Sequence, residues 1–155
     1  MNSDQTDILD LLAGHTDDST IERLAFECLM TNLTDDRVAS LMNVLGWRGN
    51  FDCFAIGGTP KVSPASASLV ARNAVHDLGG EHAIVGTYGS FLLVLVCQMG
   101  AATAEVTCTS VMPAFSEDEP VYLSPVRSGV VGASHVLRET CLLYTSPSPR
   151  DLSTS

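Results

Sequence analysis

The sequence predicts an α+β domain of the split βαβ type, also called ferredoxin-like, with elements in the order β-α-β-β-α-β. Three observations predict it. Residues 51–56 and 91–97 have the composition of short strands. Between them, residues 64–78 repeat apolar side chains at helical spacing. The link 87–90 is short enough to force the segments on either side of it into an antiparallel hairpin.

A helical pair is expected before the sheet, over residues 19–46. Ser19 and Glu22 have the spacing of a capping box, in which each side chain satisfies an amide at the other's position. A second helix begins near Thr34, and acidic side chains follow in its first turn, where the helix dipole favours negative charge. Residues 1–18 are expected to be loosely ordered.

The central segment predicts its own boundaries. Ser63 can accept from an orphan amide at the start of a helix, and Pro64 in the first helical position loses no hydrogen bond. The run 91–97 is apolar without alternation, which is typical of a central strand covered on both faces.

The second half of the domain is predicted from position. Residues 101–112 have helical length but contain several residues that favour strands. We predict a helix, because the chain must cross back to a short strand at 121–123. The sheet then has four strands with helices on one face, and another helix begins in residues 130–140. A single domain is therefore expected over 47–141.

The last fourteen residues, 142–155, change in character. They have no periodicity and resemble a translated sequencing-adaptor read-through. We treat this tail as non-native and exclude it from functional reasoning. The natural protein is expected to continue past Thr140.

Composition limits the function. The 155 residues are 45% hydrophobic, enough for one core, and carry a formal charge of −10 with a single lysine. Such a surface repels phosphate backbones and anionic lipid, so the chain should not bind nucleic acid by itself. No secretory signal and no apolar run of about 20 residues is found, which predicts a cytoplasmic protein without a membrane span.

No catalytic, cofactor-binding or metal-binding residue is predicted. Phosphoryl chemistry on this fold would need paired carboxylates at the end of the first strand and on the hairpin. The hairpin link 87–90 carries none, and Asp52 is a lone acid with a structural role. Residues 57–61 lack phosphate-loop spacing and are predicted to form a turn. The acidic run 117–119 is predicted to be a solvated loop.

Histidines and cysteines give no site either. No histidine pair has metal-ligand spacing on one helix, so surface or corner positions are expected for His15, His76, His82 and His135. The cysteines contain no Cys-x-x-Cys pair and are expected to be buried thiols of a cytosolic protein: Cys28, Cys53, Cys97, Cys108 and Cys141. Cys97, inside the apolar strand, is expected to be inert.

These segments together resemble the central region of PucR/CdaR-type bacterial transcriptional regulators. Residues 41–47 resemble the helix end and "ALGW" step before that family's first strand, and 132–137 are similar to its helix beginning "LAxAHRSAREAL". The resemblance covers about residues 19–140. It continues through three further segments: 78–80, the hairpin 82–96 and 121–126.

The resemblance implies a non-catalytic regulatory and dimerisation domain. In this family the domain is a degenerate relative of the diguanylate cyclase, or GGDEF-like, fold, and a DNA-binding helix-turn-helix follows it. That part is absent from the sequence, so no DNA-binding residue can be named here. A homodimer is implied, DNA is reached only through the missing domain, and any small-molecule effector is unknown.

Two alternatives stay open. The fold is compatible with a nucleotide-cyclase-like phosphoryl-transfer enzyme. A ligand-binding or oligomerisation module unrelated to DNA would also fit the sequence. Turnover of nucleotide with magnesium or manganese would separate the enzyme from the regulator.

Overall fold

The computed structural model describes residues 18–79, 83–99 and 102–145. Residues 1–17, on which the prediction of a loosely ordered N-terminus mostly falls, lie outside this part. The elements are, in order, the helices α2 (Asp18–Met30) and α3 (Asp36–Val44), strand β1 (Asp52–Gly58), helix α4 (Pro64–Asp77), strands β2 (Ala83–Tyr88) and β3 (Phe91–Cys97), helix α5 (Ala104–Val111) with the 3₁₀ turn η2 (Met112–Ala114), strands β4 (Tyr122–Leu123) and β5 (Arg127–Ser128), and helix α6 (Gly129–Thr145).

The sheet has the predicted split βαβ topology. Its strand order is β2-β3-β1-β4, and β5 also pairs with β1. Every pairing is antiparallel. Each crossover helix therefore joins two strands that have a third strand between them, which is the arrangement that the order of elements predicts.

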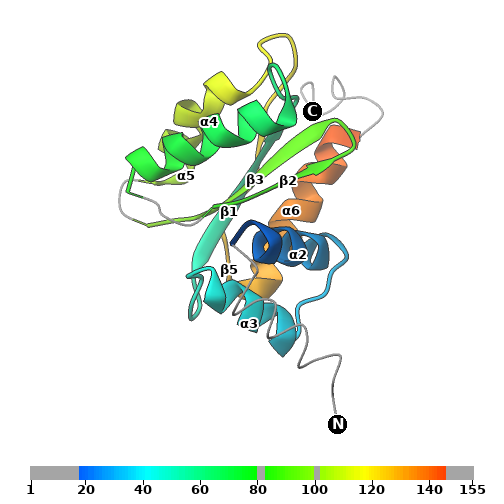
Figure 1. Cartoon of the computed structure of the whole chain (residues 1–155), viewed down its shortest axis with the longest axis vertical. Helices are drawn as coiled ribbons and strands as arrows, with labels where there is room; N and C mark the ends of the chain where they lie inside the picture. The colour runs from blue at the N-terminus through cyan, green and yellow to red at the C-terminus, as the bar shows by residue number, and fades with distance from the viewer. Residues whose placement is uncertain (1–17, 80–82, 100–101, 146–155) are drawn as a thin grey trace.

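Helices cover both faces of the sheet. The crossover helices α4 and α5 lie together on one face, and α2 and α6 lie on the other (Figure 1). Successive residues of β3 point alternately into the two cores: Leu93 and Leu95 face α2 and α6, and Leu92 and Val94 face α4 and α5. The prediction that β3 is central and covered on both faces is confirmed.

The expectation of helices on one face holds only for α4 and α5. Strands β1 and β3 are apolar on both sides, so the second face also has to be removed from water. Helix α6 covers it with Ala133, Val136 and Leu137, all fully buried. The helical pair α2 and α3 completes the same core.

The predicted start of α4 is confirmed. Ser63 is its N-cap, and the Ser63 Oγ accepts a hydrogen bond from the Ser66 N–H at 3.1 Å, with Pro64 in the first turn. Helix α3 is capped one residue later than predicted, by Asp35. A carboxylate is an effective cap because it accepts from two amides, here those of Arg37 and Val38.

The C-terminal part differs in extent from the prediction. Helix α6 begins at Gly129 and continues to Thr145, past the predicted domain boundary at Cys141. Residues 146–155, most of the segment predicted to be non-native, lie outside the described part. Within that part, no helix has the length and apolarity to span a membrane.

Candidate functional site

The hairpin end of the sheet is where the fold would place phosphoryl chemistry. Gly58, at the end of β1, pairs with Leu92, so the link between β2 and β3 lies beside the two glycines that end β1. A Cβ atom at Gly57 would lie 2.5 Å from the ring of Phe91, and one at Gly58 would lie 2.8 Å from the ring of Phe115. Aromatic rings therefore occupy the space beside both glycines.

The predicted turn at residues 57–61 is shorter than expected. Gly57 and Gly58 belong to β1. Because glycine has no Cβ atom, the strand can continue directly beneath the aromatic rings at these two positions. The chain then turns, Pro60 forms a bridge with Phe115, and the Lys61 N–H donates to the Ala114 carbonyl at 3.0 Å. The Lys61 ammonium lies 3.7 Å from Glu117, in the acidic run that was predicted to be a loop.

Asp52 lies at the opposite end of β1 from the hairpin. Its carboxylate accepts from the Ser128 hydroxyl at 2.6 Å, and its carbonyl accepts from the Gln98 N–H at 2.8 Å. These bonds join β1 to β5 and to the end of β3. The carboxylate is exposed, and the hydrogen bonds of this residue connect β1 to the neighbouring strands.

The histidines are separated. His76 lies in the last turn of α4, and His135 on α6 lies 3.5 Å from Glu139 one turn later. His15 and His82 fall outside the described residues. Across residues 18–79, 83–99 and 102–145, no group of three or more His, Cys, Asp or Glu side chains is arranged to hold a metal ion.

Burial suppresses the reactivity of the central thiols. Cys53 is fully buried, and burial raises the pKa of its thiol to about 12, with smaller contributions from Cys97 and Asp52. Burial also raises the pKa of the Cys97 thiol. A thiol is a poor nucleophile at neutral pH when its thiolate is so disfavoured.

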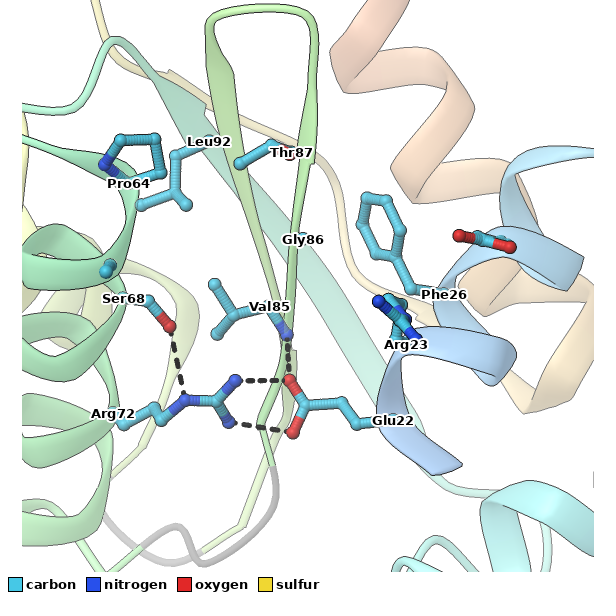
Figure 2. A pocket seen from close by; sticks show the side chains of 12 residues that line it. Glu22, Arg23, Phe26, Pro64, Ser68, Arg72, Val85, Gly86, Thr87 and Leu92 are labelled. Carbon is cyan, nitrogen blue, oxygen red and sulfur yellow. Dashed lines mark hydrogen bonds and ion pairs between the residues drawn. The ribbon is translucent and has the colours of Figure 1, made fainter. Parts of the chain in front are cut away.

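A groove of about 340 Å³ crosses the open edge of the sheet. It lies between α2 and α4, with edge strand β2 along its floor (Figure 2). Strand β2 has a partner only on its β3 side in the described sheet. The lining side chains come from these three elements and from β3: Glu22, Arg23, Phe26, Glu27, Pro64, Ala65, Ser68, Arg72, Val85, Gly86, Thr87 and Leu92.

An ion pair closes one part of this edge. The Glu22 carboxylate accepts from Arg72 in two hydrogen bonds, Nη1 to Oε1 at 2.8 Å and Nη2 to Oε2 at 2.5 Å (Figure 2). Glu22 Oε2 also accepts from the outward-facing N–H of Val85 at 2.7 Å, and Arg72 Nε donates to Ser68 Oγ at 3.2 Å. The carboxylate thus supplies the acceptor that a neighbouring strand would otherwise provide.

Sequence reasoning missed this cluster. Glu22 matched a local capping box with Ser19, but its carboxylate is directed to Arg72 and Val85 instead. The buried Val85 amide and the partly exposed Arg72 guanidinium offer this carboxylate charge-assisted bonds, which are stronger than bonds between neutral groups. Arg72 is 50 residues away in the chain, so no local pattern could reveal the pairing.

Phe26 and Gly86 form the other wall of the groove. The Phe26 ring lies against β2 so closely that a Cβ atom at Gly86 would be 2.5 Å from it. With Glu22 and Arg72 paired to each other, the groove presents mixed charge and an aromatic wall. The contacts of Glu22 and Phe26 therefore hold α2 against the edge strand β2.

Comparison with known proteins shows similarity to a solved structure. No protein-family model matches the sequence, and no curated protein does. One similar solved structure is "Crystal Structure of Regulator of Polyketide Synthase Expression from Bifidobacterium adolescentis". The two chains are 73% identical, with a TM-score of 0.81, and the match covers 83% of this chain and 53% of that one. The chain therefore spans about half the length of that protein.

Proposed function

We propose that this chain is the non-catalytic regulatory and dimerisation domain of a PucR/CdaR-type transcriptional regulator, whose helix-turn-helix lies outside the sequence. The observation that carries the proposal is the 73% identity, over most of the chain, to a protein known as a regulator of polyketide synthase expression. About half of that protein lies outside the match, which leaves room for a DNA-binding domain.

The charge of the chain supports separate roles for this domain and the proposed DNA-binding domain. The chain has 18 acidic residues against 8 basic ones, so it repels the DNA backbone. Contact with DNA is therefore assigned to the missing domain, and the acidic domain positions it. A protein that acts on bacterial DNA works in the cytoplasm, and we place the chain there.

The hairpin end of the sheet supports a role without catalysis. Residues 87–90 contain no carboxylate, and Asp52 is fastened to Ser128 at the far end of β1. The rings of Phe91 and Phe115 fill the space beside Gly57 and Gly58. Metal-dependent phosphoryl transfer requires acidic side chains that converge on the metal ions. At this end of the sheet, packed aromatic side chains occupy the space instead.

The test is to extend the reading frame past Thr140 and compare the longer protein with the present chain. We expect the extension to encode a basic helix-turn-helix. The longer protein should bind DNA from its own upstream region in fluorescence anisotropy, with affinity that falls as salt rises, and the present chain should not. An extension without such a domain, in several full-length relatives, would reject the proposal.

Catalysis and dimerisation are tested on the chain itself. Incubation with nucleoside triphosphates and Mg²⁺ or Mn²⁺ should give no product, and turnover would support the cyclase-like alternative. Asp52→Asn is the matched variant: activity that is lost while the urea midpoint stays at the wild-type value would make Asp52 a catalytic residue. Sedimentation velocity should show a dimer at high concentration, and a strict monomer would remove dimerisation from the proposal.

A further inference from the structure

Two cysteines lie directly opposite each other on the two central strands of the sheet, near the start of β1 and at the end of β3. Cys53 on β1 pairs with Cys97 on β3 in the antiparallel register. Both are thiols in the structure, and both belong to the core on the α6 side of the sheet. Their side chains therefore leave the sheet on the same face, next to each other.

The hydrogen bonds define the type of pair. The Gln98 N–H donates to the Asp52 carbonyl at 2.8 Å, so Asp52 and Gln98 form a hydrogen-bonded pair. The next pair, Cys53 and Cys97, is then of the non-hydrogen-bonded type, because the two types alternate along an antiparallel ladder. Ala55, two residues on, agrees with this assignment, since its N–H turns away from β3 to Ser124.

This pair type brings side chains closest together. Its Cα atoms lie about 4.5 Å apart in a regular sheet. Disulfides span Cα separations of about 4.4–6.8 Å, so the two sulfurs can be joined with little movement of the backbone.

We propose that Cys53 and Cys97 form a reversible oxidation site, at which a hydroperoxide converts the two thiols into a cross-strand disulfide. In the first step a Cys97 thiolate attacks the O–O bond, giving a sulfenic acid and one molecule of alcohol, or of water when the oxidant is hydrogen peroxide. In the second step the Cys53 sulfur displaces the sulfenic oxygen, which leaves as water with the Cys53 proton. Two thiols are oxidised, the peroxide is reduced, and a dithiol reductant reverses the reaction.

Exposure sets the order of the two steps. Cys97 is 8% exposed and lies at the end of β3, whereas Cys53 is fully buried. Burial also raises the pKa of both thiols, so the reactive thiolate is scarce at neutral pH. Oxidation is therefore slow at pH 7 and accelerates as pH rises, which restricts the response to strong or sustained oxidants.

The experiment uses the whole chain under native conditions. The protein is treated with hydrogen peroxide, it is then unfolded so that every remaining thiol can be alkylated, and the mass is measured intact. We expect a loss of two hydrogen atoms and a fall from five alkylated thiols to three, restored by a dithiol reductant. The reaction should be at least about tenfold faster at pH 9 than at pH 7, following the thiolate fraction.

Peptide mapping locates the bond. Trypsin places Cys53 in fragment 49–61 and Cys97 in fragment 73–127, together with Cys108. Cyanogen bromide then cleaves after Met99 and separates those two cysteines. A linked pair of fragments containing Cys53 and Cys97 is the expected result.

Variants and unfolded protein provide the controls. Cys97→Ser should abolish the intramolecular bond, and Cys108→Ser, on the other face of the sheet, should leave it intact. In guanidinium the wild-type chain should give mixed pairings. The proposal is overturned if the folded wild-type protein keeps all its thiols under peroxide that oxidises the unfolded chain, or if Cys97 is linked to a cysteine other than Cys53.

Discussion

Glu22 on α2 and Arg72 on α4 meet around the open edge of strand β2, although their helices cover opposite faces of the sheet. Two hydrogen bonds of 2.8 and 2.5 Å join the carboxylate to the guanidinium. The Glu22 side chain is only 9% exposed, and that of Arg72 is 38% exposed. The same carboxylate accepts from the Val85 N–H, so one acidic residue ties two layers of helices to the edge strand between them.

Replacing Glu22 by glutamine should destabilise the fold. The substitution removes the charge opposite Arg72, and it replaces one of the carboxylate oxygens with a donor. Because Arg72 remains partly solvated, we expect a loss of about 1–3 kcal/mol in the free energy of unfolding, below the cost for a fully buried pair. Urea denaturation measures it.

An exposed ion pair provides the control for Glu22. Glu117, whose side chain is 85% exposed, lies 3.7 Å from the Lys61 ammonium, and Glu117→Gln should leave the urea midpoint almost unchanged. If both glutamine variants shift the urea midpoint equally, the larger stabilising contribution assigned to the Glu22 ion pair is wrong.

Gly86 should not tolerate a side chain. An alanine Cβ atom at this position would lie 2.5 Å from the Phe26 ring, so the ring or the strand must move. Gly86→Ala should lower the free energy of unfolding by about 1–3 kcal/mol, the usual cost of overpacking. Thermal denaturation followed by circular dichroism checks the shift.

A double-mutant cycle identifies the cause of the Gly86 effect. Phe26→Ala alone removes a buried ring and should cost about 3–5 kcal/mol. In the double variant the new methyl group enters the space that the ring has left. The double variant should therefore be more stable than the sum of the two losses predicts. Strict additivity would show that Gly86 is needed for its backbone and not for contact with Phe26.

The sequence predicted the elements whose signals are local. The start of α4 at Ser63 and Pro64, the hairpin and the central position of β3 depend on neighbouring residues, and the structure confirms them. Strand β5 has only two residues, too few for any periodicity. It was missed because its pairing with β1 is visible only in the folded sheet.

Partners that are distant in the sequence explain why the Glu22 cluster was not predicted. Glu22 satisfied a local capping rule, yet its carboxylate binds Arg72, a partner brought near by the topology. The second helical layer was missed for a similar reason. Apolar strands require cover on both faces, but the sequence does not say which helix provides it, and α6 does so from the end of the domain.

Ser124 should be needed to continue the sheet between β4 and β5. Its hydroxyl oxygen accepts from the Ala55 N–H at 2.8 Å, on the side of β1 away from β3 and between the residues that pair with β4 and β5. The hydroxyl donates to the Pro125 carbonyl at 2.9 Å. Ser124→Ala leaves a buried amide without this acceptor, at an expected cost of about 1–3 kcal/mol. Hydrogen exchange at the Ala55 amide should accelerate.

A serine whose side-chain hydrogen bond is exposed gives the comparison for Ser124. Ser116 Oγ accepts from the Asp118 N–H at 3.3 Å in a solvated loop, where water can replace it. Ser116→Ala should therefore leave both the urea midpoint and the exchange rate at Ala55 unchanged. Unaltered exchange at Ala55 in the Ser124→Ala protein would contradict the assigned role.

Asp35 should make the stability of α3 depend on pH. The side-chain hydrogen bond from Arg37, followed by the one from the Val38 N–H, lowers the pKa of this carboxyl below its ordinary value. The charged form is favoured in the folded state, so its contribution is fully present above the pKa of the unfolded chain. It is lost as pH falls through the lowered, folded-state pKa.

Asp35→Ala tests this sign. The variant should unfold at lower urea concentration than wild type at pH 7, because α3 loses its N-cap. The difference should shrink as pH falls from about 5 to about 2, since wild-type Asp35 is then protonated as well. Asp118→Ala, in the exposed loop, controls for the general effect of removing one negative charge. A wild-type advantage over Asp35→Ala that grows toward low pH would reverse the sign and refute the assignment.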